Sequence, residues 1–216
     1  MPCLAAATRL GKARVRRRHR AALLASAAMN PAPNLILVGP MGAGKTCIGR
    51  RLAAHFDLPF TDADREIEQR TGASVTTIFE CEGEPGFRAR ERATLARVLD
   101  DDGVLLATGG GAVLDADNRR LLRERGFVVH LHVGVDQQLQ RLANDHSRPL
   151  LARDDREQVL HDLAASRAPL YAEVADLRFD TDRLTAAEAA TRLAMLLDQQ
   201  WQRPAMTMRL PDAPPA

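Results

Sequence analysis

The chain has 216 residues, of which 45% are hydrophobic and 27% charged, enough for one domain with a substantial core. Residues 1–28 hold seven of the 30 basic side chains and none of the 28 acidic ones, so the rest of the chain is acidic overall, which argues against nucleic acid as the main ligand. No apolar stretch approaches the roughly 18 to 20 residues of a membrane span, and three cysteines without a close pair exclude a disulfide framework and fit the cytoplasm.

The two ends of the chain lie outside its periodic part. Residues 1–33 are interpreted as a basic extension, and one hypothesis is that Met29 is the true start. A targeting segment and a binder of phosphate polymers are the open alternatives for this extension. Residues 202–216 are rich in proline and lack periodicity, so we expect a disordered tail.

Between these ends, apolar runs alternate with segments of helical spacing. Strands are predicted at 35–38, 104–107, 127–133 and 177–179, with residues 60–61 as a short fifth strand. Helices are predicted near 45–56, 84–99, 135–143, 155–174 and 185–200. This regular alternation is typical of an α/β domain with parallel strands, here over residues 34–201.

A glycine-rich segment with one lysine follows the first predicted strand. Its sequence at residues 39–46, GPMGAGKT, fits the phosphate-binding pattern G-x-x-x-x-G-K-[ST], and Lys45 is the only lysine after residue 12. In the order strand, loop and helix, backbone N–H groups surround phosphates and the Thr46 hydroxyl can ligate Mg²⁺. A plain flexible glycine turn is the alternative. Cys47 comes next and is predicted to be a small buried residue of the helix.

Two carboxylates, Asp62 and Asp64, come directly after the predicted strand at 60–61. At alternate positions they can face the same way, toward a Mg²⁺ ion and a hydroxyl nucleophile. Either of them could instead be the N-cap of a helix that begins near Arg65. The residues by themselves leave both interpretations open.

Three glycines and three arginines complete the candidate residues. Gly109, Gly110 and Gly111 directly follow the strand at 104–107, where backbone amides can approach a ligand at the end of a parallel sheet. Arg148 lies in a polar stretch, and Arg167 precedes a proline that interrupts a helix-like run; the third is Arg88. Each arginine, taken alone, is by default a solvated surface charge.

Taken in chain order, these segments resemble the shikimate kinase family. The matching pieces are residues 39–46, the Asp62-x-Asp64 pair with residues 67–72, Gly83-Glu84 with Gly86-Phe87-Arg88, Gly109-Gly110-Gly111-Ala112-Val113, Arg148-Pro149-Leu150-Leu151 and Arg167-x-Pro169-Leu170-Tyr171. They cover residues 34 to about 197 in the family's order and spacing. Other small kinases share only the phosphate loop, so the ordered set is specific.

The resemblance implies a fold and a reaction. The fold would be a three-layer α/β/α P-loop NTPase domain with a five-stranded parallel sheet, a substrate-binding region at about 62–91 and a lid at about 144–155. The reaction would be transfer of the ATP γ-phosphoryl group to the 3-hydroxyl of shikimate, with Mg²⁺ as cofactor, by a monomeric enzyme. Positioning and charge neutralisation are the main needs of phosphoryl transfer.

The resemblance also assigns roles to residues. The implied catalytic residues are Lys45, Asp64 and Arg148, and the implied metal ligands are Thr46 and Asp62, the latter through water. ATP contacts would come from Gly42, Ala43, Gly44, Lys45, Thr46, Cys47, Arg141 and Arg148. Shikimate contacts would come from Asp64, Arg88, Gly109, Gly110, Gly111 and Arg167, with Glu91 fixing Arg88 and with Phe79 and Phe87 against the ring.

Three alternatives remain at this point. A nucleotide switch would use the same loop, but the Asn-Lys-x-Asp segment typical of guanine-specific switches is absent from the sequence. A nucleic-acid-binding ATPase could use the basic extension. Within the enzymes, a kinase for another small hydroxy acid such as gluconate is the alternative that Arg88, Arg167 and the glycine triplet argue against.

Overall fold

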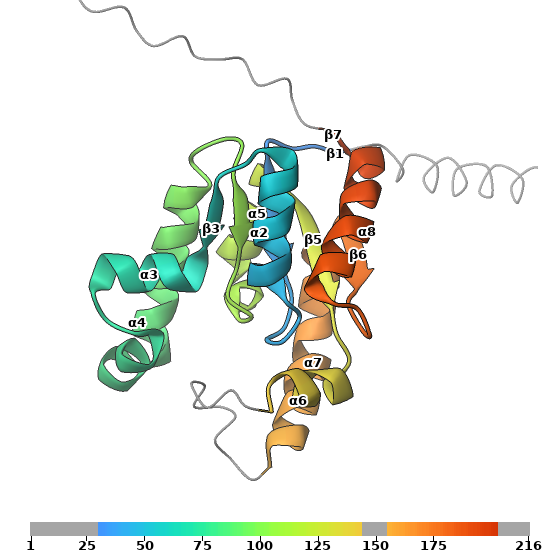
Figure 1. Ribbon diagram of the computed structural model, residues 1–216. Helices are drawn as coiled ribbons and strands as arrows, with labels where there is room; N and C mark the ends of the chain where they lie inside the picture. Colours follow the sequence, from blue (N-terminus) through green and yellow to red (C-terminus); the bar gives the residue numbers. More distant parts are fainter. Residues whose placement is uncertain (1–29, 144–154, 203–216) are drawn as a thin grey trace, which may run out of the picture. The chain divides into compact units, whose positions relative to one another are not determined.

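The structure, a computed structural model, describes residues 30–143 and 155–202. Five strands form a parallel sheet in the order β3-β4-β2-β5-β6 (Figure 1). Their bounds are β2 (Asn34–Val38), β3 (Phe60–Asp62), β4 (Leu105–Ala107), β5 (Gly126–His132) and β6 (Leu177–Asp180). Two two-residue strands, β1 (Asn30–Pro31) and β7 (Trp201–Gln202), lie outside this sheet. The predicted five-stranded parallel sheet is confirmed.

Helices cover both faces of the sheet. They are α2 (Lys45–Phe56), α3 (Ala63–Thr71), α4 (Val75–Val98), α5 (Ala116–Arg125), α6 (Val135–Arg141), α7 (Arg156–Val174) and α8 (Ala186–Gln200), with a short 3₁₀ turn, η1 (Ala112–Leu114). Figure 1 shows α2 and α8 together in front of the sheet.

The alternation of side chains along β2 divides the core into two layers. Leu35 and Leu37 belong to the cluster that packs under α2 and α8, whereas Ile36 and Val38 belong to the cluster under α4, α5 and α7. Successive side chains of a strand point to opposite faces, and all five residues of β2 are buried, as expected for a central parallel strand. The predicted three-layer α/β/α architecture is confirmed.

Helix α4 differs from its prediction at the N-terminal end. It begins at Val75, where the Ser74 side chain accepts a hydrogen bond from the amide of Thr77, and not near residue 84. Gly83 breaks the helix with a φ of 69°, a left-handed conformation that suits glycine, and Pro85 starts the second part. The predicted helix at 84–99 is therefore only this second part.

Two other helices were misjudged or missed. Pro169 does not interrupt α7, which continues from residue 156 to 174 around it. Helix α5 was not predicted, although Asp115 gives a clear start signal: its carboxylate accepts hydrogen bonds from the amides of Asp117 and Asn118. The high charge of α5 hid its apolar spacing, because Leu122 is the one large buried side chain that faces the sheet core.

The extension up to residue 29, the tail from residue 203 and nearly all of the predicted lid lie outside the described residues. Gln202, which we placed in the tail, belongs to β7. The indole Nε1 of Trp201 donates a hydrogen bond to the Ala32 carbonyl at 2.9 Å, which fixes the end of the described chain. None of the described helices is long and apolar enough to cross a membrane.

Candidate active site

The loop between β2 and α2 has the conformation that its glycines predict. Gly44 is the N-cap of α2 with a φ of 88°, and as a glycine it offers no side chain to the first amides of the helix. Gly39 has a φ of 144°, and a Cβ there would collide with the carbonyl oxygen of Leu131. The partial positive charge at the N-terminus of α2 thus faces a loop in which backbone can approach a ligand closely.

Lys45 folds back over this loop. Its ammonium donates hydrogen bonds to the carbonyl oxygens of Gly39 at 2.7 Å and Pro40 at 2.9 Å. A compact ammonium can serve two carbonyls of the loop and a phosphate with its three donors. This places the only lysine of the described residues at the mouth of the anion-binding loop.

Thr46 and Asp62 come together from two different elements. The Thr46 hydroxyl donates a 2.6 Å hydrogen bond to Oδ2 of Asp62, the last residue of β3. The other carboxylate oxygen of Asp62 accepts a 3.4 Å bond from the amide of Arg65 and caps α3. The two interpretations of Asp62, helix cap and partner of the phosphate loop, are therefore both compatible with its position.

The oxygens of Thr46 and Asp62 are suitable ligands for Mg²⁺. Mg²⁺ prefers hard oxygen ligands, keeps several waters and takes the remaining ligands from substrate phosphates. In residues 30–143 and 155–202, no group of three or more His, Cys, Asp or Glu side chains is arranged to hold a metal on its own. A site with one hydroxyl and one carboxylate suits an ion that arrives with a nucleotide.

Gly109 lies between the carboxylates of Asp64 and Glu91. A Cβ on Gly109 would stand 2.8 Å from Oε1 of Glu91 and 2.9 Å from Oδ1 of Asp64, so both groups flank the same point. Glu91 is fully buried, and burial raises its pKa; Arg88 opposes this shift, and the charge of Asp64 adds to it. The close approach explains why this position is a glycine.

Arg88 is held by two carboxylates of α4. Its Nη1 donates to Glu91 at 2.7 Å, and its Nη2 donates to Glu84 at 3.0 Å. Burial lowers the pKa of Arg88, but the two carboxylates outweigh burial and raise it, so the guanidinium stays charged. A Cβ on Gly111 would collide with this guanidinium, with Nη1 only 2.7 Å away. Arg88 therefore lies directly against the glycine triplet.

Arg167 reaches the same triplet from α7. Its Nη1 donates to the Gly110 carbonyl at 3.2 Å, and the hydroxyl of Tyr171 donates to the same oxygen at 2.6 Å. A Cβ on Gly110 would lie 3.6 Å from Arg167 Nη1 and 3.6 Å from the amide nitrogen of Met41. The triplet thus lies between the phosphate loop and two arginines from separate helices.

Arg141 connects the phosphate loop to the segment after β6. Its guanidinium donates to the Gly42 carbonyl at 3.0 Å, the Thr181 carbonyl at 2.6 Å and the Leu184 carbonyl at 3.3 Å. It also donates to the Thr181 hydroxyl at 3.1 Å. Arg141, predicted to contact ATP, is therefore located beside the loop at the end of α6, and it is hydrogen-bonded to the β6–α8 connection.

Comparisons with known proteins agree with this geometry. A family model described as shikimate kinase matches residues 41–198, well over half of the chain. The chain belongs to the shikimate kinase family. The shikimate kinase of Stenotrophomonas maltophilia strain R551-3 is 64% identical over 83% of this chain and 99% of its own length. The shikimate kinase of Xanthomonas campestris pv. campestris strain 8004 is 58% identical over 81% of this chain and 97% of its own length.

Solved structures give the same family. A shikimate kinase from Acinetobacter baumannii in complex with shikimate has a TM-score of 0.74 at 47% identity, covering 80% of this chain and 96% of that one. The predicted resemblance to the shikimate kinase family is confirmed, and the protein is an enzyme, a kinase. Membership decides against the nucleotide switch and the nucleic-acid-binding ATPase that the sequence left open.

Two predicted residues of the shikimate kinase site need comment. Cys47 is exposed, so the prediction of a buried position is wrong. Ile48 is its neighbour on α2 and points into the core, and a helix turns by about 100° per residue, which carries Cys47 away from it. Arg148 lies outside the described residues.

Three residues that contact the candidate site or one another beside it were not predicted. Gln138 is buried, and its amide donates to the Met41 carbonyl at 2.8 Å, which supports the phosphate loop from α6. His130 of β5 stacks on Tyr171 with 4.7 Å between ring centroids. Burial lowers the pKa of His130 to about 4, with smaller effects from His132, Arg178 and Lys45, so the ring is neutral at pH 7. Of the three, only His130 carried a signal in the sequence, because it is a polar residue within the apolar run of β5.

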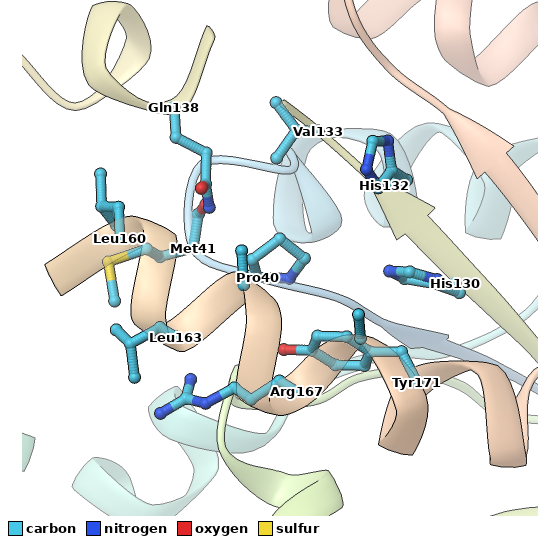
Figure 2. A pocket seen from close by; sticks show the side chains of 12 residues that line it. Pro40, Met41, His130, His132, Val133, Gln138, Leu160, Leu163, Arg167 and Tyr171 are labelled. Carbon is cyan, nitrogen blue, oxygen red and sulfur yellow. The ribbon is translucent and has the colours of Figure 1, made fainter. Parts of the chain in front are cut away.

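These rings border a cavity behind the phosphate loop. Its volume is about 110 Å³, and its lining is mostly apolar, from the loop, from the end of β5, from α6 and from α7. Figure 2 shows Pro40 and Met41 on one side of it, with Arg167 and Tyr171 on α7 opposite and His130 beyond Tyr171. The cavity adjoins the glycine triplet through Arg167, which lines it and donates to Gly110.

Proposed function

We propose that this site transfers the γ-phosphoryl group of ATP to the 3-hydroxyl of shikimate and releases ADP and shikimate 3-phosphate. The observation that carries the proposal is the meeting of two arginines, Arg88 and Arg167, at the glycine triplet that follows β4. Strand β4 pairs with β2, so this triplet lies beside the phosphate loop. One site thus combines a cradle for phosphates with cations suited to a carboxylate.

On the donor side, the backbone of Gly42, Ala43, Gly44 and the start of α2 through Cys47 binds the phosphates, and Lys45 neutralises their charge. Thr46 and Asp62 would hold Mg²⁺, Asp62 through water, and the ion would supply positive charge that offsets the negative charge of the transferred phosphoryl group. Arg141 lies against the nucleotide base. The 2.6 Å bond between Thr46 and Asp62 supports the assignment of both to one ion.

On the acceptor side, Arg88 and Arg167 bind the shikimate carboxylate, and the backbone of Gly109, Gly110 and Gly111 lies against the ring. Asp64 accepts a hydrogen bond from the attacking hydroxyl and orients it toward the phosphoryl group. Glu84 and Glu91 orient Arg88. The Acinetobacter baumannii relative was solved with shikimate bound, which supports this acceptor.

Two stacked aromatic rings support a ring-shaped acceptor. The ring centroids of Phe79 and Phe87 lie 4.6 Å apart, with 28° between the ring planes. The Arg88 guanidinium lies 5.4 Å from the Phe87 ring centroid. We propose that they form the apolar wall of the shikimate site. An open-chain acid such as gluconate would gain less from such a wall.

We propose the remaining assignments from the resemblance to the family. Arg148 approaches the transferred phosphate from a lid at about 144–155 and excludes water. The enzyme acts as a monomer in the cytoplasm. Residues 34–201 form the kinase domain, with the acceptor bound by the region at about 62–91.

An ADP-release assay with shikimate, quinate and gluconate as acceptors tests the function. We expect Mg²⁺-dependent ADP release with shikimate to exceed release with either other acid by at least about tenfold in kcat/KM. Release with shikimate no greater than with buffer would refute the proposal. A preference for gluconate would favour the alternative acceptor.

A further inference from the structure

We infer that Tyr171 is a positioning residue of the acceptor site: its buried hydroxyl holds the Gly110 carbonyl and thereby orients Arg167, which donates to the same oxygen. This inference rests on the proposed function, because it assumes that Arg167 binds the carboxylate of the acceptor. Tyr171 itself is not placed in contact with either substrate.

The hydroxyl of Tyr171 makes a short, buried hydrogen bond. The residue is 3% exposed, and its O–H donates to Gly110 at 2.6 Å. The Gly110 carbonyl has two acceptor positions, and Arg167 occupies the other at 3.2 Å. Tyr171 and Arg167 are four residues apart on α7, so they project from the same face of the helix. One carbonyl is thus clamped by two donors of one helix.

The phenol ring is fixed from its other side. It stacks on the His130 ring, with 4.7 Å between the ring centroids and 20° between the ring planes. His130 is on β5, where it pairs in register with Val38, the last residue before the phosphate loop. Tyr171 therefore joins the glycine triplet to β5, the strand that pairs with β2 just before the phosphate loop.

The protonation of this contact is stable near neutral pH. Burial raises the pKa of Tyr171 to about 12, so the phenol keeps the proton that it donates to Gly110. Its stacking partner His130 is neutral, as its pKa of about 4 requires. The clamp therefore consists of neutral groups around one cation, Arg167.

Loss of the Tyr171 hydroxyl would leave Arg167 as the remaining side-chain donor to the Gly110 carbonyl. The Gly110 carbonyl then keeps only the longer 3.2 Å hydrogen bond from Arg167. The carbonyl can shift, and the Arg167 guanidinium can shift with it. Gly110 and Arg167, which both contact the acceptor in the proposed function, then lose their fixed geometry. The phosphate loop keeps its own hydrogen bonds from Lys45 and Gln138. The effect should fall on the KM for shikimate and spare that for ATP.

The test compares Tyr171→Phe with the unaltered full-length chain. The variant keeps the ring and its stacking on His130 and removes only the O–H. We expect the KM for shikimate to rise about five- to tenfold, the loss of one good hydrogen bond, while kcat and the KM for ATP change by less than about twofold. Trp201→Phe is the matched control: it also removes a buried hydrogen bond to a carbonyl, far from the site, and should leave both KM values unchanged.

A double mutant separates positioning from general loosening. If Tyr171 acts through Arg167, then Tyr171→Phe should change the shikimate KM by less than about twofold in an Arg167→Lys background. Fully additive effects, an unchanged shikimate KM, or equal increases in both KM values would overturn the inference. Inactivity of the unaltered enzyme on shikimate would instead refute the proposed function, so the two failures are distinguishable.

Discussion

The hydroxyl of Thr46 donates a 2.6 Å hydrogen bond to the carboxylate of Asp62, joining the first turn of α2 to the end of β3. Sixteen positions separate the two residues along the chain. The bond brings the phosphate loop and the start of α3 to one point, which in the proposed function is where a metal-bound phosphate would meet the hydroxyl of shikimate. The consequences of this arrangement can be measured.

Asp62→Asn should weaken the use of Mg²⁺ without unfolding α3. Asparagine caps a helix about as well as aspartate, so the free energy of unfolding should change by less than about 1 kcal/mol. Loss of the carboxylate charge should lower kcat/KM for MgATP about 10- to 100-fold and raise the Mg²⁺ concentration for half-maximal rate. Thr46→Ser keeps the hydroxyl and is the control. An unaltered Mg²⁺ titration of the Asp62 variant would contradict a metal role.

Lys45→Arg should not preserve activity, although the charge is kept. The ammonium makes two bonds to carbonyls of its own loop, at 2.7 and 2.9 Å, in a space that suits a compact cation. We expect kcat to fall about 100-fold or more in initial-rate assays, as for the loss of one preorganised donor. Activity within about twofold of the unaltered enzyme would show that only the charge matters.

Arg88→Ala and Arg167→Ala should each weaken shikimate binding by about 2 kcal/mol or more, roughly thirtyfold in Kd, and spare ATP affinity. Their stabilities should differ. Only Arg88 is paired with a fully buried carboxylate, that of Glu91, so Arg88→Ala should also lower the free energy of unfolding by about 3 kcal/mol. Calorimetric titration and urea unfolding measure the two effects separately. Equal losses for ATP and shikimate would point to misfolding.

Gly111→Ala should disturb Arg88 more than Gly110→Ala disturbs Arg167. A Cβ at Gly111 meets the Arg88 guanidinium at less than 3 Å, whereas at Gly110 the nearest contact is 3.6 Å. We expect Gly111→Ala to cost about 1 to 3 kcal/mol of stability and Gly110→Ala to cost clearly less. Thermal unfolding of the two variants side by side decides this. The reverse order would mean that Arg88 can move away without cost.

The pH dependence of stability should carry a signature of His130. Its pKa is about 4 in the folded protein against about 6.5 for a free side chain, so folding favours the neutral ring. This contribution is complete above pH 6.5 and is lost as the pH falls toward 4, by about 2 to 3 kcal/mol. His130→Gln removes the titrating group. Its free energy of unfolding should therefore fall less steeply between pH 6.5 and 4 than that of the unaltered protein, and parallel curves would contradict the assignment.

Several features could be predicted because they depend on neighbours in the chain. The phosphate loop needs Gly39 and Gly44 for its backbone angles, and the strand before it is apolar because both of its faces are buried. The same local pattern located β4 and the glycines after it. Where local signals were weak, prediction was wrong: Gly83 splits α4, and α5 shows few apolar residues although Asp115 caps it.

By itself, then, the sequence determined the succession of the five strands along the chain, most of the helices, the phosphate loop and the candidate charged residues, since backbone angles and hydrophobic periodicity are local properties. Tertiary structure alone decided which side chains meet. Arg167 and Gly110 are 57 positions apart and Tyr171 and Gly110 are 61 apart, yet they form one clamp because β2 and β4 pair and α7 packs behind them. Such contacts depend on how faces pack over long separations, and no local pattern encodes that packing. The same packing turned Cys47 outward and placed His130 against Tyr171.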